Sequence, residues 1–205
     1  MRPAAQPRLA TREAADRPQM ALDLRVRRAV QILAHGGVVA YPTESVYGLG
    51  CDPLDLAAVA RILELKQRPV TAGLILIGAE LDHVLPWLDV DEAQLDALVS
   101  SWPGPITWVA PCHPDAPAWI TGGRDSVAVR VTAHPLAAAL CRGFGRAIVS
   151  TSANRRGRPP VRSALGVRLR FASERLDYVL PGATGGSGRP TEIRDLRSGR
   201  ILRAG

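Results

Sequence analysis

The chain has 205 residues, of which 46% are apolar and 22% charged, and its formal net charge at pH 7 is +7. This composition is that of an ordinary soluble globule. No apolar run approaches the ~20 residues that span a bilayer, and the N-terminus lacks the apolar core of a signal peptide. These features exclude a membrane protein and predict a cytoplasmic one.

The N-terminal residues 1–19 are rich in Pro, Ala and Arg without a clear period, which predicts a disordered tail. Organised sequence begins just after Met20, which could be the true start, so we expect the folded domain at residues 20–205. A helix capped by Asp23 should open this domain. It should end at the glycine pair 36–37.

The next segments predict a strand, a loop and a helix. Residues 38–41 form a short apolar run typical of a buried strand, and the glycine-punctuated residues 43–50 predict a loop after it. Asp55 can cap a helix that a proline ends, which puts Lys66 and Arg68 at the helix end or just beyond. The predicted buried stripe of this helix excludes both cations and consists of Leu56, Val59, Ala60, Ile62 and Leu63.

The rest of the chain alternates strands and helices. Strands are expected at residues 74–77, 106–110, 126–131, 147–149 and 178–180, and helices at 80–87, 91–101, 135–142 and 161–171. Residues 111–125 and 182–188 should be loops, and 192–193 and 201–202 a closing pair of edge strands. With no repeat and no linker, this pattern predicts a single α/β domain with a twisted mixed β-sheet flanked by helices.

Positive charge is concentrated in the last quarter of the chain. Residues 155–205 contain twelve arginines and four acids, for +8, whereas residues 1–154 contain 14 basic and 15 acidic residues, for −1. Such a stretch favours an anionic ligand or a nucleic-acid surface. A solvated arginine-rich face would have the same charge.

Familiar motifs of nucleotide and metal enzymes are absent from the sequence. There is no GxxxxGK[ST], GxGxxG, GxSxG or HExxH. The four histidines lie singly, and the three cysteines are far apart without metal-binding spacing, so neither a disulfide framework nor a protein-held metal is indicated.

Three polar clusters remain as candidates for chemistry. They are Thr43-Glu44-Ser45, Lys66 with Arg68, and Ser150-Thr151-Ser152-Ala153-Asn154. Open α/β sheets bind ligands outside strand ends, so the clusters could converge on a phosphate ester and a small zwitterion. The serine-rich run taken alone also fits a helix cap or a turn.

Lys66 is the only lysine of the chain, beside 25 arginines. A compact ammonium with three donors suits a crowded phosphate, whereas arginine presents a broad planar fork. The alternative explanation is that one lysine survived a compositional drift toward arginine.

Six segments, in order, resemble the threonylcarbamoyl-AMP synthase family (YrdC type, bacterial TsaC-like). They are YPTESVYGLG, LELKQRPVTAGLILI, WPGPITWV, DSVAVRVTAHPL, VSTSAN and TEIRDLRSGRILRAG, and together they run from about residue 23 to residue 205. The resemblance implies a YrdC-like fold in its single-domain form, with a concave basic ligand groove. It also implies a nucleotidyltransferase that makes threonylcarbamoyl-AMP and pyrophosphate from L-threonine, bicarbonate and ATP.

The same resemblance implies roles for residues and partners. The family's KxR and SxN signature corresponds to four residues expected to be catalytic and to bind ATP: Lys66, Arg68, Ser152 and Asn154. The ATP site would be completed by Ser150 and Arg203, and L-threonine would be bound by Thr43, Arg130 and Thr191. Mg2+ would be held by ATP phosphates and water. The product would pass to the tRNA threonylcarbamoyl-transferase complex, for t6A at position 37 of tRNAs that read ANN codons.

The rival interpretation is a module that grips double-stranded RNA or pre-ribosomal RNA through the basic C-terminal quarter. That quarter has few aromatic side chains, which counts against stacking on single strands. The two interpretations can coexist, because an adenylate-forming enzyme can also contact tRNA.

Overall fold

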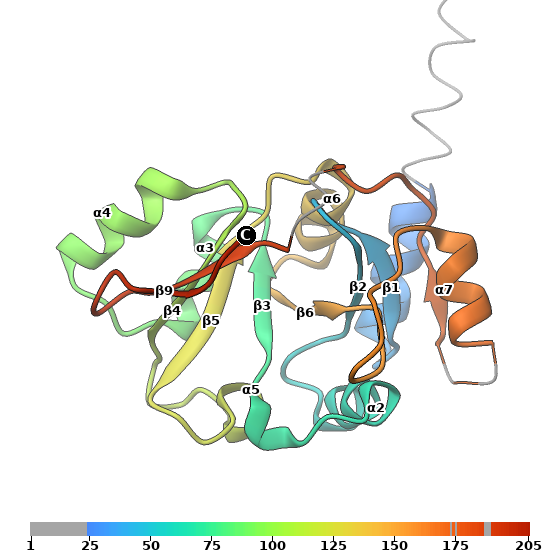
Figure 1. Cartoon of the computed structure of the whole chain (residues 1–205), viewed down its shortest axis with the longest axis horizontal. Coiled ribbons are helices and arrows are strands. Elements are labelled where there is room, and N and C mark those ends of the chain that lie inside the picture. The colour runs from blue at the N-terminus through green and yellow to red at the C-terminus, as the bar shows by residue number, and fades with distance from the viewer. Residues whose placement is uncertain (1–23, 173, 175, 187–189) are drawn as a thin grey trace, which may run out of the picture.

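The computed structural model describes residues 24–205 except 173, 175 and 187–189. Within these residues, nine strands form one sheet in the order β7-β1-β2-β6-β3-β5-β4-β8-β9 (Figure 1). The strands are β1 Val39–Pro42, β2 Tyr47–Gly50, β3 Ile75–Gly78, β4 Ile106–Pro111, β5 Ser126–Val131, β6 Ile148–Ser152, β7 Tyr178–Val179, β8 Glu192–Asp195 and β9 Ile201–Arg203. Parallel and antiparallel pairs are mixed, so the predicted mixed sheet is confirmed.

Helices lie on both faces of this sheet. They span residues 24–34, α2 Leu56–Lys66, α3 Leu81–Val84, α4 Glu92–Ser101, α5 Ala118–Thr121, α6 Pro135–Phe144 and α7 Ala164–Arg170, with 3-10 turns at Val70–Ala72 and Leu85–Trp87. The predicted tail and the Asp23 cap lie outside the described residues. None of the helices in the described ranges is long and apolar enough to cross a bilayer.

Neighbouring residues of one strand pack into different cores, because side chains alternate across a strand. Val39 and Ile77 are buried with helix 24–34 and α6. Ala40 and Leu76, one residue away in each strand, are buried with α2, α5 and α7 instead. Continuous apolar runs in these strands therefore reflect a sheet covered on both sides.

The predicted start of α2 and two residues of its predicted buried stripe, Val59 and Ile62, are confirmed, but the rest of the stripe is not. The Asp55 carboxylate accepts a hydrogen bond from the Ala58 N–H at 3.0 Å, as an N-cap should. Leu56, predicted to be buried, is exposed, whereas Leu65 and Lys66 are buried. The helix therefore presents its last turn to the sheet.

Residues 43–50 were predicted to be a loop, but Tyr47–Gly50 form β2 and pair antiparallel with β1. The glycines of β2 allow close packing rather than a turn. A Cβ on Gly50 would come within 2.8 Å of Tyr41 Cε1 and 2.6 Å of the Val149 carbonyl oxygen. Glycine in a strand interior commonly marks such a close approach.

Strand β6 changes partner along its length. Residues 148–150 pair with β3, and residues 151–152 pair with β2. The sheet thus has two parts that meet at β6, one ending in β7 and the other in β9. The serines predicted to follow this strand belong to it.

Smaller differences concern the second half of the chain. Helix α5 lies within the predicted loop 111–125, and α7 begins at Ala164, with Ser163 as its cap, rather than at residue 161. Of the predicted pair of edge strands, only β9 is at an edge, because β8 pairs with β4 as well.

Candidate active site

Two adjoining cavities collect the nine residues predicted for the site. The first, of about 280 Å³, is lined by Thr43, Arg68, Arg130, Ser150, Ser152, Thr191 and Arg203. The second, of about 350 Å³, is lined by Lys66 and Asn154 and shares Arg68 and Ser152 with the first. The residues come from the turn before β2, the end of α2, the strands β5, β6 and β9, the segment after β6 and the residue before β8. The fold therefore brings the three polar clusters together.

Lys66 ends α2 and is 6% exposed. Its Nζ donates to the Ser152 carbonyl at 2.5 Å, to the Asn154 carbonyl at 3.0 Å and to Asn154 Oδ1 at 3.3 Å. All three ammonium donors are thus directed at the last residue of β6 and at the segment that follows it. The predicted position outside the buried stripe is wrong, because acceptors 86 and 88 residues away bury this side chain.

Burial lowers the pKa of Lys66 to about 8, with a further contribution from the charge of Arg68. Burial also lowers the pKa of Arg68, and so does the nearby Arg124. Arg68 Nη2 donates to the Ala72 carbonyl at 3.1 Å. Two neighbouring cations in a partly buried site indicate a binding place for an anion.

Asn154 organises the turn that follows β6. Its Oδ1 accepts from Ser152 Oγ at 2.5 Å as well as from Lys66. Its Nδ2 donates to the Arg155 carbonyl at 3.2 Å and to the Arg158 carbonyl at 2.6 Å. One amide therefore fixes both the ammonium and the turn.

Arg130 lies on β5 and is 4% exposed. Its Nη1 donates to Thr107 Oγ1 at 3.3 Å and to Thr191 Oγ1 at 3.0 Å, and its Nη2 to Glu44 Oε2 at 3.3 Å. Its buried Nε has no hydrogen-bond partner among the described residues. Arg203 Nη2 donates to the Thr191 carbonyl at 2.6 Å, which adds a second arginine beside this threonine.

Two residues of the site were missed from the sequence. Arg162 lines the first cavity, although its position predicted a helix. Glu44 belongs to a cluster noted in the sequence but was not assigned a role, and it contacts Arg130 directly. The available signals were the arginine-rich run after residue 154 and a lone acid in a glycine-rich segment.

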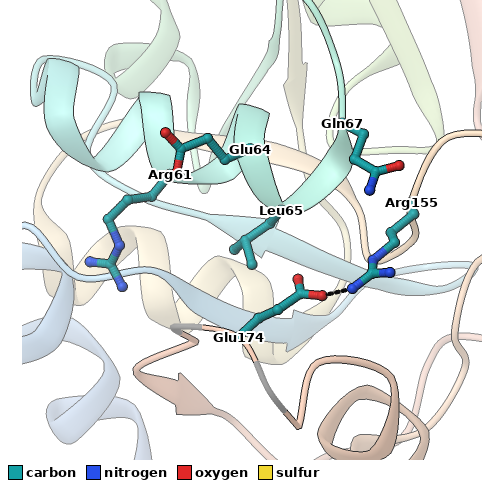
Figure 2. Close-up of a pocket in the computed structure, with 6 residues that line it drawn as sticks. All are labelled: Arg61, Glu64, Leu65, Gln67, Arg155 and Glu174. Carbon is teal, nitrogen blue, oxygen red and sulfur yellow. Dashed lines mark hydrogen bonds and ion pairs between the residues drawn. The ribbon is translucent and has the colours of Figure 1, made fainter.

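A third cavity, of about 370 Å³, lies beside the C-terminal half of α2 (Figure 2). It is lined by Arg61, Glu64, Leu65, Gln67, Arg155 and Glu174. Figure 2 shows Arg155 directed at Glu174, with which it forms an ion pair. No predicted site residue lines this cavity, but Arg155 directly follows Asn154, so the ion pair supports the active-site turn from outside.

Within the described ranges, no group of three or more His, Cys, Asp or Glu could hold a metal ion. The oxygen atoms bonded by Lys66 Nζ are the carbonyls of Ser152 and Asn154 and the side-chain amide of Asn154, which also accepts from the Ser152 hydroxyl. This donor set fits a Mg2+ that is bound mainly by phosphate oxygens and water.

Comparisons with known proteins point to one family. The model of the Sua5, YciO and YrdC family, described as "Telomere recombination", matches residues 31–205. The chain is 58% identical to a threonylcarbamoyl-AMP synthase of Alkalilimnicola ehrlichii, covering 88% of this chain and 95% of that relative. It is 53% identical to the protein of the same name from Nitrosococcus oceani, covering 87% and 97%.

Solved structures agree with the sequence matches. The structure of P. abyssi Sua5 complexed with L-threonine has a TM-score of 0.82 and 35% identity, covering 88% of this chain and 54% of that chain. This chain thus spans about half the length of that relative. E. coli YciO has a TM-score of 0.79 and 27% identity, covering 89% and 90%. The chain therefore belongs to the Sua5, YciO and YrdC family, together with the threonylcarbamoyl-AMP synthases.

Proposed function

We infer that this chain is an L-threonylcarbamoyladenylate synthase, which makes threonylcarbamoyl-AMP and pyrophosphate from L-threonine, bicarbonate and ATP for the t6A modification of tRNA. Relatives with this name match it over nearly their whole length. The observation that carries the inference is the convergence of the sole lysine with Arg68, Ser152 and Asn154 beside a buried arginine.

The two cavities divide the substrates. L-threonine occupies the first, where its carboxylate pairs with Arg130 and its other groups approach Thr43 and Thr191. The position of Arg130 in the lining of this cavity supports the role, because a carboxylate accepts hydrogen bonds from a guanidinium fork. ATP extends from the first cavity into the second. Its phosphates are bound by Lys66, Arg68, Ser150, Ser152, Asn154 and Arg203.

The reaction is an adenylyl transfer, so we class the enzyme as a nucleotidyltransferase. The deprotonated threonine amine bonds to the carbon of CO2 derived from bicarbonate, and a carbamate forms. A carbamate oxygen then attacks the α-phosphorus of ATP, and the bond to pyrophosphate breaks. Negative charge develops on the phosphate oxygens, where Lys66 and Arg68 stabilise it. Holding three reactants in one site supplies much of the acceleration.

Mg2+ would accompany ATP, bound mainly through phosphates and water, and Ser152 and Asn154 are the residues that would help to hold it. When bound, it supplies further positive charge to the phosphates. The labile product would pass to the tRNA threonylcarbamoyl-transferase complex in the cytoplasm.

An RNA-binding role is a second candidate, because Arg156, Arg158 and Arg168 are exposed in the basic C-terminal quarter. Such a surface binds the phosphate backbone with a steep dependence on salt. It would add tRNA contact to the synthase activity rather than replace it.

Pyrophosphate release from ATP tests the proposed function. We expect release only when L-threonine and bicarbonate are both present, with threonylcarbamoyl-AMP as the second product. Salt-dependent RNA binding without any threonine-dependent release would favour the RNA-binding module instead.

The lowered pKa of Lys66 predicts a pH dependence of ATP binding. Below a pH of about 8 the ammonium is charged, and above it the charge is lost. Because the neutral amine attracts phosphate weakly, we expect the affinity for ATP to fall above pH 8 by up to about tenfold per pH unit. Calorimetric titration without threonine measures this dependence. The variant Lys66→Arg should not show this fall in affinity. If the wild-type affinity for ATP does not change up to about pH 10, Lys66 does not bind the phosphates.

A further inference from the structure

We propose that Glu44 is a positioning residue for threonine, which orients Arg130 and offsets its charge so that the cavity takes a zwitterionic amino acid rather than an inorganic anion. The proposal rests on the proposed function, because it assigns Arg130 to the substrate carboxylate. It adds a residue that lies outside the KxR and SxN signature.

Glu44 is held from two sides. Its Oε1 accepts from Thr132 Oγ1 at 2.6 Å and from the Ala133 N–H at 3.1 Å, and its Oε2 accepts from Arg130 Nη2 at 3.3 Å. Both Thr132 and Ala133 directly follow β5, the strand that carries Arg130. The carboxylate therefore bridges the turn before β2 to the end of β5, and the orientation of Arg130 depends on that bridge.

The hydrogen bonds of Arg130 fix the plane of its fork at the wall of the first cavity. A guanidinium has five N–H donors in a fixed plane. Three hydrogen bonds go to Thr107, Thr191 and Glu44, and the buried Nε is left without a partner among the described residues. Because the fork is rigid, the hydrogen bonds of Nη1 and Nη2 set the direction in which the guanidinium meets the cavity. Glu44 thus acts on the ligand through Arg130.

Charge gives Glu44 its second role. The lining of the first cavity includes Arg68, Arg130, Arg162 and Arg203, and no Asp or Glu among its described residues. Burial favours the neutral form of Glu44, but the charge of Arg130 and hydrogen bonds from Thr132 and Ala133 outweigh this and hold its pKa below the usual value. Glu44 is therefore ionised at neutral pH. It reduces the attraction of this part of the cavity for multiply charged anions such as sulfate.

The substitution Glu44→Gln tests both roles. A glutamine has one oxygen and one NH2 group, whereas both sides of Glu44 face donors, so at least one of these hydrogen bonds is lost. We expect the KM for L-threonine to rise about tenfold or more, with the KM for ATP changed by less than about threefold. Inhibition by sulfate in competition with threonine should become several-fold stronger.

The sulfate measurement separates positioning from a general loss of structure. A loosened site would bind both threonine and sulfate more weakly. Removal of one negative charge beside Arg130 should instead weaken the binding of threonine and strengthen the binding of sulfate. Asp52→Asn is the matched control: Asp52 is 13% exposed, like Glu44, and it pairs with Arg146 at 2.6 Å away from the cavity. We expect a lower melting temperature for this control and an unchanged KM for threonine.

Thr132→Val is the second variant, for the case that Glu44→Gln does not fold. It removes the hydroxyl donor at 2.6 Å and leaves both charges in place. We expect a smaller rise in the KM for threonine, of about two- to tenfold. Threonine-dependent pyrophosphate release by the wild-type enzyme tests the proposed function separately. If the wild type releases pyrophosphate and neither variant changes the KM for threonine, the role of Glu44 is refuted and the proposed function stands.

Discussion

Lys66→Arg should reduce adenylate formation about 100- to 1,000-fold, although it preserves the positive charge. The ammonium donates to three acceptors on Ser152 and Asn154, at 2.5 to 3.3 Å. A planar guanidinium is wider and cannot point three donors at one such set of oxygens. The substitution should therefore displace both the cation and the turn after β6, and the loss should appear in the rate of pyrophosphate release.

The same substitution should also lower stability. Lys66 is 6% exposed, so the larger guanidinium would have to fit a closely packed place, and the three hydrogen bonds of the ammonium would be broken or distorted. We expect a loss of about 1–3 kcal/mol in the free energy of unfolding, measured by denaturant titration. Lys66→Ala should be at least as damaging to turnover.

Arg61→Lys provides the control for Lys66→Arg, since it exchanges the same two residue types on the same helix. Arg61 lines the third cavity (Figure 2) and pairs with Asp177 at 2.7 Å. Turnover of this control should stay near normal. If the Lys66→Arg enzyme is as active as the Arg61→Lys enzyme, Lys66 has only a structural role.

Asn154→Asp should raise the KM for ATP about 100-fold, although aspartate has nearly the same shape. The new carboxylate would stand beside Lys66 Nζ, in the cavity assigned to the phosphates. It would repel them and neutralise the ammonium. It would also turn an oxygen toward the carbonyls of Arg155 and Arg158, which now accept from Nδ2.

Gln67→Glu is the matched control for this change, because it adds one negative charge in the residue next to Lys66. Gln67 lines the third cavity rather than the phosphate cavity. The KM of the Gln67→Glu enzyme for ATP should change by less than about threefold, because the added charge is exposed. Steady-state kinetics at saturating threonine measure both variants. An unchanged KM for Asn154→Asp would show that the phosphates bind elsewhere.

The sequence was sufficient for features that depend on neighbouring residues. Asp55 is identified as a cap from the sequence because a cap bonds to an amide three residues away. Lys66 was singled out because it is unique in the chain. The mixed sheet followed from the alternation of short apolar runs with helical periods.

Features that depend on distant residues could not be predicted in this way. The burial of Lys66 and the partner of Glu44 are both set by residues 86 positions away in the chain. The glycines of β2 predict a loop from the sequence, whereas in the structure they pack against the ring of Tyr41 in the neighbouring strand. Single-residue signals cannot show such pairings, since they arise only when the sheet assembles. The concave basic groove stays a prediction.

The change of partner along β6 has a consequence for how substrate and fold depend on each other. Thr43 belongs to the part of the sheet that ends in β7, whereas Arg130 and Thr191 belong to the part that ends in β9. A threonine held by all three would bridge the seam at β6 with contacts that the empty protein lacks. Any ligand that binds the folded state alone stabilises it by mass action. Here the added stability would oppose movement of one half-sheet relative to the other. The bound substrate would therefore act as a temporary part of the scaffold.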